Sequence, residues 1–159
     1  MDGFLLLVAH LTADFILQED WQAQNKTNPH PGPIPGRDRP ADGSPIVSAD
    51  AAQQFVLWHG RLRLWWIGHL ACTAHCLIYT AAIWVASFWW LPWWGVPAVF
   101  VSHWVIDRFR LARVWMERVS NQKQFATGPL SPWSVIVIDQ CFHLLVLAAI
   151  ALVVKLSPS

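Results

Sequence analysis

Four apolar stretches dominate the sequence, and their lengths constrain the fold more than any other feature. An α-helix rises about 1.5 Å per residue, so crossing the roughly 30 Å hydrocarbon core of a bilayer takes about 20 residues. We expect helices at about 3–20, 64–91, 93–115 and 133–156. Pro92 and Gly95 favour a tight break between the second and third helices. The sequence therefore predicts an all-α fold, a four-transmembrane-helix bundle that forms a single integral membrane domain over residues 1–159.

The composition supports a membrane location. Charged residues make up 13% of the chain, against about 25% in an average soluble protein. The chain is also rich in tryptophan, with 12 residues, and this side chain collects where an apolar ring meets water at the faces of a bilayer. A net charge of +1 creates no field that would attract a polyanion, so we expect no nucleic-acid partner. Membrane lipid is the expected partner.

The basic residues predict the orientation. Ten of the eleven lie either between the first and second apolar stretches or between Ile106, where the apolar part of the third stretch ends, and the fourth: Lys26, Arg37, Arg39, Arg61, Arg63, Arg108, Arg110, Arg113, Arg118 and Lys123. The positive-inside rule places both connections in the cytoplasm, and therefore both chain ends outside (N-out, C-out). We expect a multi-pass protein of the bacterial inner (cytoplasmic) membrane. The Pro- and Gly-rich residues at about 27–56 predict a flexible cytoplasmic insertion between the first two helices.

Three of the predicted helices carry a histidine and an aspartate four residues apart. The pairs are His10 and Asp14, His103 and Asp107, and, in reversed order, Asp139 and His143. Residues at i and i+4 share a helix face, one turn apart. The fourth helix runs in the opposite direction to the first and third, so its reversed order places all three aspartates on the cytoplasmic side of their histidines.

The second helix adds His75, about 11 residues into the predicted span and at a depth similar to that of His143. We therefore expect two layers in the bundle. The deeper layer contains His10, His75, His103 and His143, and the layer one turn nearer the cytoplasm contains Asp14, Asp107 and Asp139. Ionisable side chains are costly within a membrane and usually have a function there.

Imidazole nitrogens and carboxylate oxygens are ligands for Zn²⁺, Mn²⁺ and Fe²⁺, and helix bundles build such sites from side chains on facing helices. We expect all seven residues of the two layers to bind one or two divalent metal ions. Seven ligands exceed the needs of one tetrahedral ion. The alternative is a buried network of His–Asp ion pairs that only holds the bundle together.

Other polar residues suggest fewer roles. Arg61, Arg63 and Arg108 follow the positive-inside rule or form a clamp for a phosphate group. Gln140 is adjacent to Asp139, so we expect it on a different part of the helix surface. The three cysteines, Cys72, Cys76 and Cys141, have no CxxC spacing and are odd in number. They predict no disulfide framework and are expected as small apolar side chains.

The motifs together resemble those of an uncharacterised family of small four-helix integral membrane proteins from bacteria and phages. They occur in the order HxxxD, H, HxxxD and DQxxH, in the segments 10–26, 75–80, 102–107 and 139–143. The resemblance covers nearly the whole chain and departs from the family at about 27–56, where the family passes quickly to its second helix. It implies a His/Asp site that is similar in style to those of membrane-bound metal-dependent hydrolases.

A metal-dependent hydrolase is the function that we expect first. A divalent ion activates water and polarises the scissile group, and Asp107 or Asp139 could act as the general base. The depth of the site favours an amphiphilic lipid or lipid-phosphate substrate. The chain lacks HExxH and GxSxG motifs, so the corresponding peptidase and esterase mechanisms are not expected. Two alternatives remain open: a protein that binds or transports metal ions or protons, or a haem- or pigment-binding subunit. A homo-oligomer or a larger membrane complex would suit either alternative.

Overall fold

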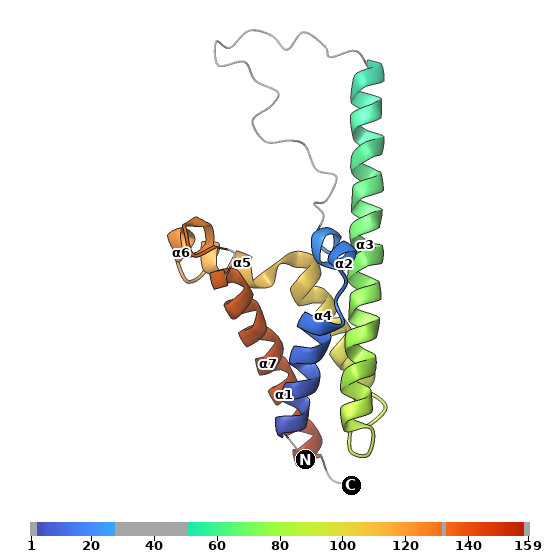
Figure 1. The fold of residues 1–159 in the computed structure, drawn as a ribbon, viewed down its shortest axis with the longest axis vertical. Helices are drawn as coiled ribbons and strands as arrows, with labels where there is room; N and C mark the ends of the chain where they lie inside the picture. The colour runs from blue at the N-terminus through green and yellow to red at the C-terminus, as the bar shows by residue number, and fades with distance from the viewer. Residues whose placement is uncertain (1–2, 28–50, 132, 158–159) are drawn as a thin grey trace.

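The computed structural model describes residues 3–27, 51–131 and 133–157 (Figure 1). Every regular element in these residues is helical, which confirms the all-α class. The elements are α1 (Gly3–Leu11), the π-helical turn η1 (Thr12–Ile16), α2 (Asp20–Asn25), α3 (Ala51–Ser87), α4 (Gly95–Phe109), α5 (Leu111–Arg118), α6 (Lys123–Thr127) and α7 (Trp133–Leu156). Most of the predicted insertion at 27–56 lies outside the described residues, as do Arg37 and Arg39.

Four helices form the body of the molecule. The helix α4 packs against α3 and α7, and α1 packs against α3. The two chain ends and the α3–α4 connection lie at one end of this body, and α2, α5 and α6 lie at the other (Figure 1). We call these the hairpin end and the α5 end. This arrangement brings residues from all four helices together at the centre.

Two helices of the described chain are long and apolar enough to cross a membrane by length and composition, Leu62–Ser87 and Trp133–Leu156. The apolar helix Gly3–Ile16 is shorter. Much of the apolar surface of α7 faces outward, since the side chains of Leu145 and Leu156 are 69% and 73% exposed. A core helix of a soluble protein would bury such side chains, so α7 is better suited to contact lipid.

The first helix differs from its predicted bounds of 3–20. The α-helical part ends at Leu11, a π-helical turn continues to Ile16, and α2 then begins at Asp20. The side chain of Gln22 accepts a hydrogen bond from the backbone N–H of Glu19 at 3.2 Å, which satisfies a donor at the start of α2. A local capping interaction therefore starts a new helix where the apolar pattern alone suggested a continuous one.

The third predicted helix, 93–115, is also interrupted. The helix α4 ends at Phe109, and α5 begins at Leu111. Arg110, between them, has left-handed backbone angles with φ 51° and ψ 47°. One such residue redirects the chain, because helical hydrogen bonding cannot continue through it. Apolar periodicity does not reveal a break of one residue.

The second helix starts earlier than predicted and ends earlier, at Ala51 and Ser87 instead of about 64 and 91. The hydroxyl of Ser87 donates a hydrogen bond to the carbonyl of Ile83, and the backbone then turns before Pro92. The fourth helix, α7, spans 133–156, the residues expected from the sequence.

A small apolar cluster lies beside the centre of the bundle, and it includes Leu6, Tyr79, Val99 and Leu147. Each of these four residues is four positions from one of the four predicted histidines. In α1, α4 and α7 the aspartate is four positions away in the other direction. The histidines therefore lie between an apolar layer on the hairpin side and an aspartate layer on the α5 side.

Candidate metal centre

Three helices each bring a histidine and an aspartate to the centre on one face. Asp14 lies in η1, Asp107 lies near the end of α4, and Asp139 lies in the second turn of α7. The nitrogen–oxygen distances are 3.8 Å for His10 and Asp14, 3.5 Å for His103 and Asp107, and 3.4 Å for His143 and Asp139. The side chain of Asp139 is 24% exposed, and the other five are buried.

His75 on α3 and His103 on α4 meet at the centre, where their Nε2 atoms lie 3.1 Å apart. The Nε2 atom of His75 is 3.3 Å from Asp14 Oδ1 and 3.5 Å from Asp107 Oδ2. The Nε2 atom of His103 is 3.4 Å from Asp14 Oδ1 and 3.5 Å from Asp107 Oδ2. Two nitrogens and two oxygens from three helical segments, η1, α3 and α4, therefore face one another.

The nitrogen–nitrogen and nitrogen–oxygen distances among these four atoms have the spacing of a tetrahedral ligand set. Ligand atoms about 2.0–2.2 Å from an ion, at tetrahedral angles, are about 3.4 Å apart. Five of the six separations among the four atoms are between 3.1 and 3.5 Å. Asp14 Oδ1 is also buried and accepts no hydrogen bond from the described residues. A buried carboxylate oxygen without a donor fits a cation. The donor set His75, His103, Asp14 and Asp107 therefore suits a divalent metal ion.

A second group shares Asp107. The Nε2 atom of His143 is 3.2 Å from Asp107 Oδ1 and 3.4 Å from Asp139 Oδ2. The rings of His103 and His143 stack with centroids 4.0 Å apart. Potential ligand atoms of Asp107, Asp139 and His143 all lie within 4.8 Å of one another. Asp107 thus contributes one oxygen to each group, an arrangement in which a carboxylate can bridge two ions.

His10 lies at the edge of this cluster. Its Nδ1 atom is 2.8 Å from the hydroxyl of Tyr79 and 3.8 Å from Asp14 Oδ2. None of the three-residue groups of possible ligands among the described residues includes His10. The structure thus brings together six of the seven predicted ligands in such groups, and places the seventh beside them. The hydroxyl of Tyr79, the only tyrosine in the chain, orients the imidazole of His10.

Lys26 enters the centre from the end of α2. Its Nζ atom donates hydrogen bonds to Asp107 Oδ2 at 2.9 Å and to Gln18 Oε1 at 3.0 Å. Burial alone would lower the pKa of Lys26, but the adjacent Asp107 carboxylate outweighs it and raises that pKa above its ordinary value. A permanently charged ammonium group therefore lies beside the shared aspartate. In the sequence, Lys26 stands out only as a basic residue that indicates orientation.

One prediction about a neighbouring polar residue is wrong. Gln140 belongs to the site, because its Nε2 atom donates a hydrogen bond of 3.0 Å to Asp14 Oδ2. The π-helical turn brings Asp14 within reach of a residue one position from Asp139. Arg108 is buried, and its Nε atom donates a hydrogen bond of 3.5 Å to His69 Nδ1. The side chain of Arg61 lies outside the described residues.

The cysteines are free. Cys72 and Cys76 are buried, and their sulfur atoms lie 4.0 Å apart on one face of α3, whereas Cys141 is exposed. Both buried sulfurs lie within 4.8 Å of Asp107 and of each other, so they form a further group of potential ligands. Sequence analysis expected only small apolar side chains at these positions.

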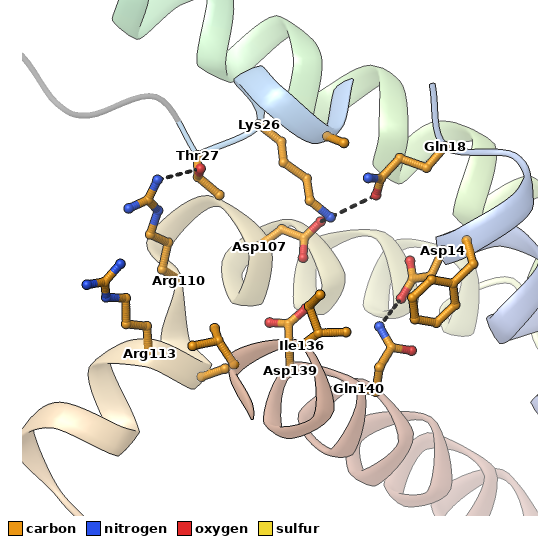
Figure 2. Close-up of a pocket in the computed structure, with 14 residues that line it drawn as sticks. Asp14, Gln18, Lys26, Thr27, Asp107, Arg110, Arg113, Ile136, Asp139 and Gln140 are labelled. Carbon is orange, nitrogen blue, oxygen red and sulfur yellow. Dashed lines mark hydrogen bonds and ion pairs between the residues drawn. The ribbon is translucent and has the colours of Figure 1, made fainter. Parts of the chain in front are cut away.

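A pocket of ≈ 500 Å³ opens beside the carboxylates at the α5 end (Figure 2). Asp14, Asp107 and Asp139 line one part of it. Three cationic side chains and two amides line other parts: Lys26, Arg110, Arg113, Gln18 and Gln140. Apolar side chains complete the wall, among them Phe15, Val135 and Ile136. The pocket gives a ligand access to the same aspartates that form the candidate metal centre.

Some of these residues left a signal in the sequence. Lys26 and Gln140 belong to the segments that resemble the membrane-protein family, and Tyr79 follows His75 by one helical turn. Arg110 and Arg113 left no separate signal, because the expected continuous helix over 93–115 gave no reason for them to face the aspartates.

Residues 58–159 match the sequence profile of a family described as "Protein of unknown function (DUF3307)". The chain therefore belongs to this family. The matched residues include His75, His103, Asp107, Asp139 and His143, whereas His10 and Asp14 precede the match. No curated protein and no solved structure matches the chain.

Proposed function

We propose that this protein is a metal-dependent hydrolase of the bacterial inner membrane that acts on an amphiphilic lipid or lipid-phosphate substrate. One observation carries the proposal: a tetrahedral set of His75, His103, Asp14 and Asp107 borders a pocket lined by two of the same carboxylates. A site that only held the bundle together would not need access from outside.

The proposed topology is a four-span bundle with both chain ends outside. The exposed tryptophans support it. Trp89 and Trp93 lie at the hairpin end, 60% and 84% exposed, and Trp21, Trp115 and Trp133 lie at the α5 end, 46–71% exposed. Two such bands are typical of the two faces of a bilayer. The basic residues of α5 lie with the second band, so the α5 end is the proposed cytoplasmic face.

The two shorter spans require support from their neighbours. At about 1.5 Å per residue, α1 with η1 and α4 are each roughly 20 Å long, less than the hydrocarbon thickness. We propose that α2 and α5 lie at the cytoplasmic interface, where their exposed Trp21 and Trp115 would contact head groups. The metal centre would then lie about one to two turns below the cytoplasmic face.

The exposure of each side chain at the metal centre suggests its proposed role. His75, His103, Asp14 and Asp107 would hold one divalent ion of Zn, Mn or Fe, and His143 with the second oxygen of Asp107 would hold another. A bound divalent ion supplies Lewis-acid activation of water and of the scissile group. Asp139 is the most exposed of the three aspartates and lines the pocket, so it is the proposed general base. Asp107 is buried and shared, and is assigned as a ligand.

Transport is the weaker proposal. The layer of Leu6, Tyr79, Val99 and Leu147 packs between the histidines and the hairpin end. A metal ion or proton crossing one chain would have to pass these apolar side chains. The site is closed by these apolar residues on the hairpin side and open through the pocket on the α5 side. Such a site is better suited to a reaction than to the transport of an ion across the membrane.

The test begins with the metal content of the detergent-purified protein. Wild type should contain one to two divalent ions per chain, and His103→Ala/Asp107→Ala should lose most of them. Metal-loaded wild type should then hydrolyse a member of a panel of phospholipids and lipid phosphates in mixed micelles, and the variant should not. A metal-free, folded wild type that chelators do not alter would refute the metal centre. Metal uptake into protein-containing vesicles, without lipid turnover, would support transport instead.

A further inference from the structure

The cationic side of the pocket has a feature that the metal centre does not explain. Arg110 and Arg113 lie one turn apart at the start of α5 and border the same pocket as Lys26 (Figure 2). The guanidinium of Arg110 donates a hydrogen bond of 2.6 Å to the neutral hydroxyl of Thr27. Among the described residues, no carboxylate forms an ion pair with Arg110.

The two arginines repel each other. Burial lowers the pKa of Arg110 below its ordinary value, and the neighbouring charge of Arg113 lowers it further. Arg113 has one partner, Glu117, at 2.6 Å, and that ion pair is partly exposed to solvent. Glu117 offsets the charge of Arg113 alone, so the two adjacent guanidinium groups retain a net positive charge, and an anion between them would relieve the repulsion.

The backbone holds this arrangement at an energetic cost. Arg110 is the left-handed residue that separates α4 from α5. A non-glycine residue adopts this conformation only with backbone strain. Such strain is often retained at binding sites, where it aims a side chain. Here it turns the chain so that both arginines border the pocket.

The rest of the pocket indicates what the anion is attached to. Phe15 on η1 and Val135 and Ile136 on α7 form an apolar wall, and Phe15 is 54% exposed. Cationic groups next to apolar groups suit an amphiphile whose charged head lies near the aspartates and whose chain follows the helices. Guanidinium pairs bind phosphate through two parallel hydrogen bonds, and an ammonium group adds a point charge.

We propose that Lys26, Arg110 and Arg113 bind the phosphate group of a lipid phosphate monoester and present it to the metal centre. This inference names the substrate class and rests on the proposed function for the reaction, although the anion site is testable without metal. These three residues take the place of Arg108, whose side chain contacts His69, as the proposed phosphate clamp.

The test measures binding of short-chain phosphatidic acid to the purified protein in neutral detergent by titration calorimetry, with and without chelator. Arg110→Gln/Arg113→Gln should bind at least ten-fold more weakly than wild type. Arg118→Gln removes a charge from the same helix at an exposed position outside the pocket, and should bind like wild type. Diacylglycerol, which lacks the phosphate, should not bind at this site.

Further measurements distinguish a lipid phosphate from free inorganic phosphate, and separate the proposed anion site from the proposed hydrolase. Inorganic phosphate should compete only weakly, and competition equal to that of the lipid would overturn the lipid assignment. Unchanged affinity in Arg110→Gln/Arg113→Gln would overturn the clamp. Thermal unfolding shows whether this variant is folded, and Arg110→Lys/Arg113→Lys retains the charge if the glutamine variant is not. Arginine-dependent binding by a protein that never takes up metal would support the clamp and refute the hydrolase.

Discussion

The two sides of the histidine layer differ although the same helices build both. On the hairpin side, one turn from the histidines, lie Leu6, Tyr79, Val99 and Leu147, and the only polar group among these four side chains, the Tyr79 hydroxyl, is hydrogen-bonded to His10. On the α5 side, also one turn away, the same faces carry three aspartates that border a pocket. The aspartate side is open to a ligand through the pocket and the other side is an apolar cluster, so the proposed reaction would be approached from the α5 end. Substitutions on the two sides should therefore have separable effects.

The largest effect is expected at the shared aspartate. Asp107→Asn should abolish metal binding and activity, because Asp107 contacts His75, His103 and His143. It should also destabilise the protein by about 3–5 kcal/mol, since it removes the carboxylate that pairs with Lys26 and leaves this charge with the neutral amide of Gln18. Elemental analysis and thermal unfolding in detergent measure the two effects.

The matched control is Asp107→Asn/Lys26→Met. Removing both charges should restore much of the stability but none of the metal. If the double variant is as unstable as the single one, the ion pair is not the source of the loss.

The second effect compares two buried histidines. His75→Ala should lower the metal content at least ten-fold, because His75 belongs to the tetrahedral set. His10→Ala should retain most of the metal, because His10 contacts Tyr79 and lies outside the ligand groups. Equal losses in the two variants would show that His10 is also a ligand. The metal content of both proteins, purified side by side, decides between these outcomes.

Metal removal should lower the stability of the wild type. A ligand that binds only the folded state stabilises it by about 2.7 kcal/mol at 100 times its dissociation constant. A chelator should therefore lower the unfolding temperature of wild type by several degrees and leave that of Asp107→Asn unchanged. A shift of the same size in both proteins would mean that the stabilising ions bind elsewhere.

The smallest effect on function is expected on the hairpin side. Leu147 is 7% exposed within the apolar cluster, and Leu147→Ala should cost about 2 kcal/mol through the cavity that it leaves. Its metal content should equal that of wild type at a temperature where the variant is folded. A loss of metal in this variant would show that the two sides of the histidine layer are not separable.

The features of the site that could be predicted correctly from the sequence depend on local spacing along single helices. The pairs at i and i+4 are set by helix geometry, so His103 with Asp107 and Asp139 with His143 could be placed on shared faces without knowing the fold. The position of His75 along the axis of the bundle was predictable for the same reason, because each residue adds a fixed rise along a helix. Metal binding by these residues stays a prediction.

Contacts that depend on breaks in the helices could not be predicted in this way. Gln140 reaches Asp14 because η1 is π-helical, and Lys26 reaches Asp107 because α2 begins after a turn. Arg110 and Arg113 border the pocket because one left-handed residue redirects the chain. Each depends on backbone geometry to which hydrophobic periodicity is insensitive.

The sequence by itself determined an all-helical chain, the extent of its last helix, and which histidines and aspartates share a face, because these follow from segment length and the period of the helix. Only the tertiary structure decided that His75 and His103 meet Asp14 and Asp107 at ligand spacing, and that Lys26 and two arginines complete the pocket. Those features depend on the packing of helices far apart in the sequence and on the backbone breaks that orient them.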